Sequence, residues 1–498
     1  MTSPATARTP RVLVDLAASA SPAQVVETHI SVLFLLGDRA FKLRKPVRFG
    51  FLDFSRREAR ESDCYREVEL NRRYAPDVYL GVYDISDGGE PIDHLVVMRR
   101  LPADRRLSEL VRHGSAGRRE IDAVARVVLQ ADERAERTVR INAEARPDAL
   151  LAGWRTNGEE LAPFLGTVID ASANEEIQRL AANYLQGRSA LLEDRIRQGR
   201  VRDGHGDIRA EDIYCLEDGP RILDCVEFDD TLRYGDVLCD LAFLVMDLEH
   251  LGAPDLGREL LRSYATSSGD TFPFSLVDAY CASRAYVRAK VACLGTAEGV
   301  PGSEEEARSY HSLAHRLLVR ARVKLVLVGG LPGTGKSSLA ASLGASFDMA
   351  VLRADVVRKE LAQSCAVGTA ELYADEMTDA TYEAMLAAAR PLLEHGQSVV
   401  LDASWHDEAM RSRASSLAAE TASELVEFQC CAPRAITEAR IQLRRQRGDD
   451  PSDATIDVAR AMAEITDEWP RAIQIDTSDT PAHSLELAAA ALRPRHGG

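Results

Sequence analysis

Short apolar runs separated by polar turns mark the first hundred residues. The runs at 32–37, 39–45, 78–85 and 94–100 are rich in β-branched and aromatic residues, which predicts strands. Between the two pairs, the charged stretch over about 55–74 has its apolar residues at helical spacing. This order predicts a small sheet that carries one helix.

Helical periodicity dominates the next part of the chain, from about 105 to 200. The polar segment 205–214 then reads as a loop, and a short strand pair follows it. Apolar helices are predicted over 235–251 and 278–294. A mainly helical lobe therefore follows the small sheet.

Strand and helix signals alternate from residue 323 onward, which predicts a parallel sheet with helices on both faces. The glycine, proline and glutamate content of 295–309 is typical of a connector. We therefore predict two domains joined by a linker. The predicted boundaries are 1–310 for the first domain, with a small lobe over about 20–102 and a large lobe over about 103–310, 311–322 for the linker, and 323–498 for the second domain.

Composition fits a multidomain globular protein, since 498 residues exceed what one hydrophobic core usually serves. No apolar run approaches the roughly 18 residues that span a bilayer, and the N-terminus lacks a continuous signal-peptide core. The nine cysteines lack CxxC spacing, which favours reduced thiols. We expect a cytoplasmic protein with no membrane partner.

The net charge of −17 argues against non-specific wrapping of nucleic acid, although it leaves a local basic groove open. An acidic protein also suits a cationic small substrate. Most acidic proteins are simply well solvated, so charge alone does not choose a substrate.

A P-loop is the clearest motif, because residues 330–337 match G-x-x-x-x-G-K-[ST] between an apolar strand and a helix-forming run. Glycines allow backbone N–H groups to face phosphate, Lys336 neutralises phosphate charge, and Ser337 can bind magnesium. We predict ATP and Mg²⁺ as cofactors. The predicted nucleotide-binding residues are Gly330, Gly333, Thr334, Gly335, Lys336, Ser337 and Ser338.

Two acids follow predicted strands of this second domain. Asp355 ends the second strand and Asp402 the third, at the sheet edge where ligands collect. One acid can activate a substrate hydroxyl while the other supports a metal ion, although either can instead cap a helix.

An arginine-rich helix lies further along the chain. Its arginines can form a lid over the transferring phosphoryl group, with Arg440 and Arg444 as the predicted catalytic pair, or an exposed face. The four arginines are Arg440, Arg444, Arg445 and Arg447.

With these motifs, residues 323–480 resemble the small P-loop kinases related to zeta toxins and to the kinase domain of polynucleotide kinase. The resemblance implies that Asp355 acts as the base on the acceptor hydroxyl and that Arg358 faces the substrate. It implies the reaction and leaves the acceptor open.

The loop HGDIRAEDIY at 205–214, with Asp224 seventeen residues beyond Asp207, resembles the aminoglycoside phosphotransferase-like enzymes. These belong to the protein-kinase-like fold, which has two lobes. The resemblance implies that Asp207 is the catalytic base and that Asp224 binds magnesium. Asp212 stands where such loops usually carry asparagine, and we predict it as a second metal ligand.

Lys42 fits the lysine that contacts the α- and β-phosphates in this resemblance, and Glu67 fits its helix partner. We choose Glu67 over Glu69 because helical spacing places it on the more apolar face, with Cys64 and Leu70. Either glutamate can instead pair with neighbouring arginines. No G-x-G-x-x-G loop precedes Lys42.

Nearly the whole chain resembles bacterial bifunctional aminoglycoside phosphotransferase/ATP-binding proteins of the AAA family. We therefore predict an ATP-dependent phosphotransferase with two nucleotide sites, acting on hydroxyl groups of small molecules. One alternative is a P-loop kinase acting on nucleotides or nucleic-acid ends. Another is a P-loop enzyme regulated by an N-terminal pseudokinase, an alternative that Asp212 motivates. The acceptors and the oligomeric state stay open.

Overall fold

The computed structural model describes residues 24–28, 30–49, 52–87, 89–365, 374–447 and 454–492. They fall into two compact units. Unit 1 draws on the segments Met1–Ala149, Arg195–Thr271 and Tyr280–Leu313, and unit 2 on Leu150–Asp194, Phe272–Ala279 and Ala314–Gly498.

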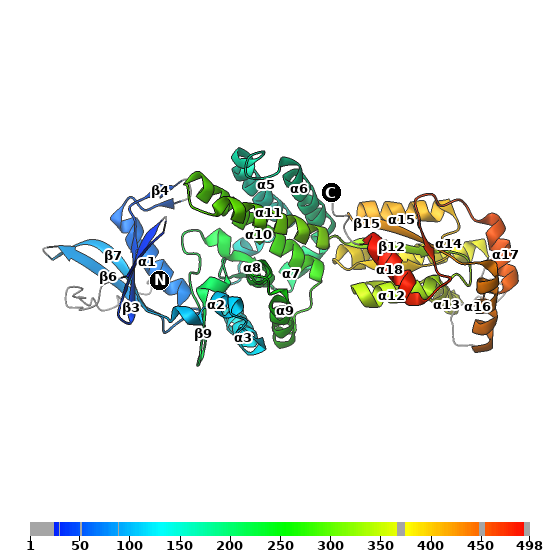
Figure 1. Ribbon diagram of the computed structural model, residues 1–498, viewed down its shortest axis with the longest axis horizontal. Coiled ribbons are helices and arrows are strands. Elements are labelled where there is room, and N and C mark those ends of the chain that lie inside the picture. Colours follow the sequence, from blue (N-terminus) through cyan, green and yellow to red (C-terminus); the bar gives the residue numbers. More distant parts are fainter. Residues whose placement is uncertain are drawn as a thin grey trace. The chain divides into compact units, whose positions relative to one another are not determined.

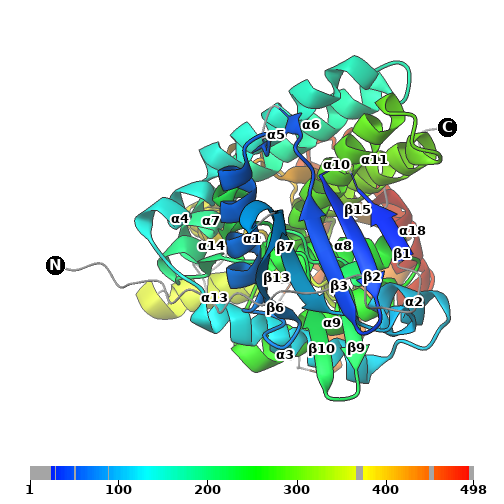
Figure 2. The same ribbon diagram turned by 90° about the vertical axis from the view of Figure 1, so that its left-hand side faces the viewer.

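The sheet of unit 1 is antiparallel. Its strands, in spatial order, are β1 (Gln24–Glu27), β2 (Ser31–Leu36), β3 (Arg39–Arg44), β7 (Glu90–Arg99) and β6 (Tyr79–Asp87). Helix α1 (Arg57–Asn71) packs on one face, where Cys64 and Val68 join a buried cluster with Val96 (Figure 2). The predicted small sheet with one helix is confirmed.

The rest of unit 1 is mainly helical, as predicted. Its helices include α2 (Leu107–Arg112), α3 (Arg118–Arg134), α4 (Val139–Glu144), α8 (Val237–His250) and α9 (Pro254–Ser268). Its short strands pair as β4 (Arg48–Phe49) with β5 (Leu52–Asp53), β8 (Val201–Asp203) with β11 (Tyr234–Asp236), and β9 (Ile213–Leu216) with β10 (Gly219–Ile222). The 205–214 loop begins shortly after β8, and Asp224 follows β10.

Four of the five divisions between the units fall inside helices, and the fifth falls in the segment after α9. These helices are α5 (Pro147–Leu161), α7 (Ser189–Arg197), α10 (Phe274–Ala297) and α11 (Ser303–Arg320). Most of the predicted linker, 311–322, is therefore helical, because its apolar residues recur at helical spacing and Leu313 and Leu317 are buried. The domain boundaries remain a prediction.

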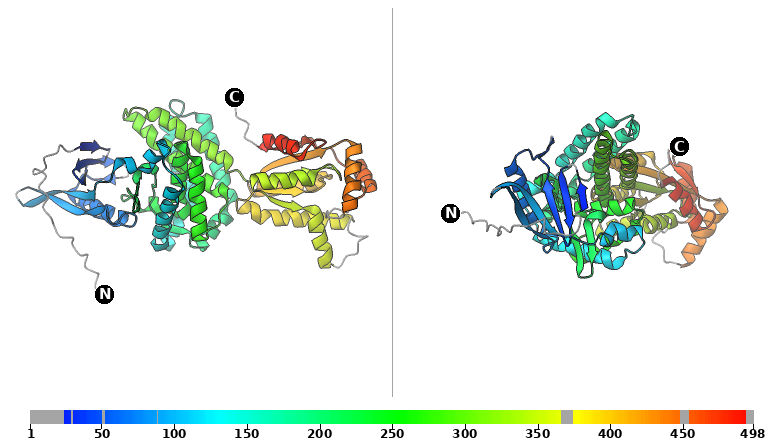
Figure 3. Two further views of the ribbon diagram at one scale, coloured as in Figure 1. Left: turned by 60° about the horizontal axis from the view of Figure 1, so that its bottom comes forward. Right: turned by 60° about the vertical axis from the view of Figure 1, so that its left-hand side comes forward.

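The sheet of unit 2 is fully parallel. Its strands, in spatial order, are β13 (Ala350–Arg353), β14 (Val399–Asp402), β12 (Lys324–Gly329), β15 (Glu424–Cys431) and β16 (Ile473–Asp476). On one face, Val326 and Phe428 share a core with Leu339 of α12 (Lys336–Phe347) and Leu492 of α18 (Pro481–Leu492). Helices cover both faces of this sheet, as Figures 1 and 3 show, so the predicted architecture is confirmed.

The other helices of unit 2 connect these strands or precede them. They are α6 (Ala171–Gly187), α13 (Ala354–Cys365), α14 (Asp375–Glu394), α15 (Glu408–Glu420), α16 (Arg434–Arg447) and α17 (Ile456–Ile465). In the part of the chain that the structure describes, no helix combines the length and the apolar character that crossing a membrane requires.

Arg188, just after α6, links two other helices through hydrogen bonds that no sequence pattern predicts. Its buried guanidinium donates to the carbonyl oxygens of Leu393 and Thr421, at the ends of α14 and α15. Helix C-termini carry unsatisfied carbonyls and partial negative charge, so a cation there is favourable. Burial nevertheless lowers the pKa of Arg188 to about 10.

Candidate functional sites

Three residues predicted for the upstream site lie together in unit 1. The Nζ of Lys42, on β3, is 2.9 Å from Oε1 of Glu67 on α1 and 3.0 Å from Oδ1 of Asp224. Burial disfavours the charge on Lys42, but the two carboxylates outweigh it and raise the pKa of Lys42 well above its ordinary value. Glu69 instead pairs with Arg66 at 3.0 Å on the surface.

Arg44 joins this group, and the sequence reasoning missed it. Its guanidinium donates to Asp63 at 2.6 Å and to Glu67 at 2.8 Å, and it contacts Glu227. Lys42 and Arg44 are two residues apart on one strand, so their side chains leave the same face. That spacing was the available signal for Arg44, since strand periodicity places it beside Lys42.

Buried acids of α8 hold the 205–214 loop. Asp240 accepts hydrogen bonds from the backbone N–H groups of His205 (2.6 Å) and Gly206 (2.8 Å), and Asp247 accepts one from Ala210 (2.8 Å). Burial lowers the pKa of His205 to about 4, so its ring is neutral at pH 7. The sequence reasoning missed both acids, although charged residues inside the apolar stretch 237–250 were a signal.

Arg209 lies between the two acids of this loop. Its Nε is 3.4 Å from Oδ1 of Asp207, and its Nη2 is 3.1 Å from Oδ2 of Asp212. Burial raises the pKa of both carboxyl groups, and the Arg209 charge opposes that rise. Oδ1 of Asp207 accepts no hydrogen bond from any described residue.

These acids fit a magnesium ion by their chemistry. Asp212 and Asp224 supply carboxylate oxygens, the ligands that hard divalent cations prefer. The Asp224 side chain is 51% exposed, and its backbone has a left-handed φ of 66°, which sets it apart from the strand before it. Among the described residues, no group of three or more His, Cys, Asp or Glu side chains forms a ready metal cluster.

The P-loop of unit 2 connects β12 to α12 and needs its glycines. Gly330 has a φ of 138°, and a Cβ there would lie 2.6 Å from the carbonyl oxygen of Cys430. Gly333 has a φ of 82°, and its Cβ would lie 2.6 Å from the carbonyl oxygen of Thr437. The loop therefore presents backbone rather than side chains at the N-terminus of α12, where Lys336 begins the helix.

Asp402, at the end of β14, is the buried acid of this site. Its side chain is 3% exposed, and Oδ1 accepts no hydrogen bond from the described residues, while Oδ2 is 3.3 Å from Nε of Arg353. Burial raises the pKa of Asp402, against the opposing effects of Lys336, the Ser337 hydroxyl and Arg353. A carboxylate oxygen without a partner beside the Ser337 hydroxyl fits a magnesium ion.

Asp355 lies one element later than expected. Strand β13 ends at Arg353, so Asp355 falls in the first turn of α13, because the chain turns into the helix immediately after the strand. Its Oδ1 accepts a hydrogen bond of 3.1 Å from Arg358. The structure thus brings Asp355 and Arg358 together.

The arginines of α16 differ from one another. Arg440 lies against the P-loop, since its Nη1 would be 3.4 Å from a Cβ on Gly335, and it donates to the carbonyl oxygen of Thr477 at 2.7 Å. Arg444 donates instead to Ala454 at 3.0 Å. Arg445 is exposed, and the side chain of Arg447 lies outside the described part of the chain.

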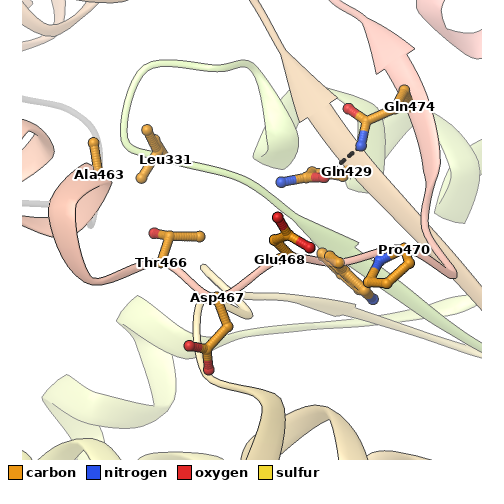
Figure 4. Close-up of a pocket in the computed structure, with 9 residues that line it drawn as sticks. Leu331, Gln429, Ala463, Thr466, Asp467, Glu468, Pro470 and Gln474 are labelled. Atoms are coloured by element: carbon orange, nitrogen blue, oxygen red, sulfur yellow. Dashed lines mark hydrogen bonds between the residues drawn. The ribbon is translucent and has the colours of Figure 1, made fainter.

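A pocket of about 490 Å³ borders the P-loop at Leu331 (Figure 4). Its wall is formed by the ends of β15 and β16 and by the segment after α17. Lining residues include Leu331, Gln429, Thr466, Glu468, Trp469 and Gln474. No sequence pattern predicts this pocket, because its residues come from four separate segments.

Comparison with known proteins covers most of the chain. The protein is 41% identical over 472 residues to the uncharacterized proteins Rv2004c of Mycobacterium tuberculosis and Mb2027c of Mycobacterium bovis, across 93% of this chain and 94% of each relative. The chain belongs to their family. Residues 325–468 also match the AAA domain family.

Solved kinase structures are similar to the N-terminal and the C-terminal part of the chain separately. A choline/ethanolamine kinase family protein from Mesorhizobium loti covers 61% of this chain and 90% of its own, at 16% identity and a TM-score of 0.40. A gluconokinase from Sinorhizobium meliloti covers 34% and 91%, at 16% identity and a TM-score of 0.26. An APS kinase from Mycobacterium tuberculosis covers 34% and 97%, at 18% identity and a TM-score of 0.28.

The AAA match and the parallel sheet confirm the predicted P-loop domain. The antiparallel sheet, its single helix and the helical lobe form the kinase-like architecture predicted for the N-terminal part. The AAA match also agrees with the predicted nucleotide site of the P-loop domain.

Proposed function

We propose that each unit of this protein transfers the γ-phosphate of ATP to a hydroxyl group of a small molecule. In unit 1 the proposal rests chiefly on Lys42, which lies within 3.0 Å of both Glu67 and Asp224. In unit 2 it rests on the glycine-rich P-loop and on Oδ1 of Asp402, which accepts no hydrogen bond from the described residues. Phosphoryl transfer mainly requires positioning and charge stabilisation, which such arrangements supply.

In unit 1, Lys42 binds the α- and β-phosphates and Glu67 fixes its position. Asp224 and Asp212 hold magnesium, which supplies charge neutralisation for the phosphates when it is bound. Asp207 receives the proton of the acceptor hydroxyl, and the oxygen without a hydrogen bond is available for that proton.

Arg209 supports an active site rather than a pseudokinase. Asp212 adds a negative charge where kinase loops usually carry a neutral amide, and this charge would repel both Asp207 and the phosphates. Arg209 lies within 3.4 Å of both acids, so part of that repulsion is already offset within the loop.

In unit 2, the P-loop backbone and Lys336 bind the phosphates, and Arg440 neutralises charge on the transferring group. Ser337 and Asp402 hold magnesium. Asp355 takes the proton of the acceptor hydroxyl, while Arg358, 3.1 Å away, keeps that carboxylate oriented toward the substrate.

The test separates ATP binding from transfer at each site. Asp207→Asn and Asp355→Asn, made singly and together in the full chain, should each retain ATP binding, because neither residue holds phosphate. The double variant should lose transfer to a metabolite mixture supplied with labelled ATP, since an amide cannot accept the proton. Asp457→Asn, which removes a 94% exposed carboxylate, is the control.

Parallel loss of ATP binding and transfer would mean that the two acids are structural. Full transfer by the double variant would contradict the proposed function.

A further inference from the structure

The pocket of Figure 4 is continuous with the phosphate-binding site of unit 2. Leu331 belongs to the P-loop, and the Trp469 ring covers Gly329 so closely that a Cβ there would lie 2.3 Å from it. The loop after Asp402 also reaches both places. The carbonyl oxygen of Ser404 accepts from Gly330 at 3.1 Å, and that of His406 accepts from Asp467 at 2.9 Å.

The pocket lies on the sheet face away from α12. Phe428, Cys430 and Ile475 point into the core shared with α12, so the intervening Gln429 and the adjacent Gln474 point to the opposite face. A ligand in this pocket would therefore approach the P-loop from the face that α12 does not cover.

Two polar groups in the pocket, the Glu468 carboxylate and the amide nitrogen of Gln429, form no hydrogen bond or ion pair with any described residue. In Figure 4 the Glu468 carboxylate points toward Gln429, and the amide nitrogen of Gln429 points away from Gln474 toward the Leu331 side. The other polar side chains are already engaged. Gln474 donates to Gln429 at 2.5 Å, and the Thr466 hydroxyl donates to Met462 at 2.6 Å.

Asp467 is engaged as well and turns away from the pocket, since its carboxylate accepts from the backbone N–H of Glu408 at 2.9 Å (Figure 4). Glu468 is therefore the one carboxylate that faces the pocket among its lining residues. Leu331, Ala463, Trp469 and Pro470 supply the apolar part of the lining.

Asp467 and Glu468 are the charged residues that line the pocket. None of its lining residues is a lysine or an arginine. Glu427 accepts a hydrogen bond from the Trp469 ring at 3.0 Å, behind the wall. Arg411, one of the cations near the pocket, is buried and donates to the backbone carbonyls of Trp405 and Glu468 at 2.7 and 2.9 Å, so it does not neutralise the Glu468 carboxylate directly.

We propose that this pocket binds the acceptor of the P-loop site and selects hydroxyl compounds that carry an ammonium group. Glu468 binds the ammonium group, Gln429 donates to a hydroxyl oxygen, and the apolar wall contacts the carbon chain. This inference rests on the proposed phosphotransfer by unit 2. The acceptor oxygen forms the new bond to the γ-phosphorus, the bond to ADP breaks, and the hydroxyl proton passes to Asp355.

Three six-carbon probes test the selection, because they differ only at one end. Glucamine carries an ammonium group, sorbitol a hydroxyl group and gluconate a carboxylate. We would titrate each into the full-length protein by calorimetry, with magnesium and a non-hydrolysable ATP analogue present. Glucamine should bind about tenfold more tightly than sorbitol, since a hydrogen bond to a charged partner exceeds a neutral one by roughly that factor, and gluconate should bind most weakly.

Glu468→Gln should reduce glucamine affinity about tenfold and leave sorbitol affinity within about twofold. Glu464→Gln, which removes the same charge from an exposed position of α17, should change neither. The affinity for the ATP analogue should be the same in all three proteins. Gluconate binding as well as glucamine, equal losses in both variants, or a parallel loss of nucleotide affinity in Glu468→Gln would each overturn the inference.

A transfer assay distinguishes this inference from the proposed function. Phosphorylation of sorbitol that depends on Lys336 but not on Glu468, with no preference for glucamine, would support phosphotransfer and overturn the selection for ammonium. Glucamine that binds through Glu468 and is not phosphorylated would support the selection and contradict transfer to this acceptor.

Discussion

The two phosphate-binding sites differ in how their cations are held. In unit 1, Lys42 and Arg44 are surrounded by carboxylates, with Glu67 in contact with both. In unit 2, the charge of Lys336 acts on the Asp402 carboxylate without a direct ion pair recorded among the described residues, and Arg440 donates to a backbone carbonyl. One site is assembled by ion pairs between side chains, the other by the shape of a glycine-rich backbone.

The difference shows what each site needs in order to fold and to bind. A buried ion-pair network is strongly weakened when one partner is removed, because the remaining charge is left uncompensated. A backbone cradle depends instead on conformations that only glycine adopts without cost. Mutations of charged side chains should therefore affect folding in unit 1 and mainly ligand binding in unit 2.

The largest expected effect concerns Lys336. Lys336→Ala should lower transfer by unit 2 about 10²- to 10³-fold, because the phosphate charge loses a cation placed for the transition state. Thermal stability should hardly change, since no ion pair within the described chain is broken. Turnover is measured in an Asp207→Ala background that silences unit 1, with the exposed Arg445→Ala as control. Undiminished turnover would refute the P-loop assignment.

Glu67 and Glu69 provide a matched test in unit 1. Glu67→Gln should lower turnover by unit 1 about 10²-fold and also lower the melting temperature, because Lys42 and Arg44 both lose a charged partner. Glu69→Gln should change stability by less than about 0.5 kcal/mol, since its pair with Arg66 is exposed. Both are measured in a Lys336→Ala background. Equal effects of the two changes would show that Glu67 has no special role.

A smaller effect is expected for Asp212. Asp212→Asn leaves one side-chain oxygen for magnesium, while it removes a charge that repels Asp207 and the phosphates. We expect the second effect to be the larger, so this variant should lower the magnesium concentration needed for half-maximal turnover by about threefold. ATP turnover against magnesium is measured in the Lys336→Ala background, with Asp224→Ala as the inactive control. If the natural sequence matches that control at every concentration while Asp212→Asn turns over ATP, unit 1 is a pseudokinase.

The smallest effect concerns stability in unit 2. Burial raises the pKa of Asp402, so the folded state binds this proton more readily than the unfolded state does. Stability therefore falls as the pH rises from about 4 through the raised pKa. Asp402→Asn should increase the free energy of unfolding at pH 7, and the gain should shrink toward pH 4.

Chemical denaturation at several pH values measures this gain, with Asp457→Asn as the exposed control. A gain that is independent of pH would mean that ionisation of Asp402 is not its cause. Transfer by unit 2 should fall in the same variant, since the amide binds magnesium more weakly than the carboxylate.

The sequence by itself determined the local elements. Short apolar runs specify the strands of both sheets, and helical spacing specifies α1, because side chains repeat about every 3.6 residues in a helix. The P-loop was also readable, since its function depends on consecutive backbone groups and needs glycine at Gly330, Gly333 and Gly335. Chemistry of this kind depends on contiguous residues, so a sequence motif is enough to predict it.

Tertiary structure decided what depends on residues far apart in the chain. Arg44 meets Glu227 across 183 positions, and Arg188 meets Thr421 across 233, so no local pattern records either contact. Asp355 was predicted at the end of a strand but lies in a helix, because packing sets where the chain turns after β13. The pocket beside Leu331 likewise joins four segments. Sequence periodicity fixes which face a side chain leaves, and only the packing of elements fixes which partner it meets there.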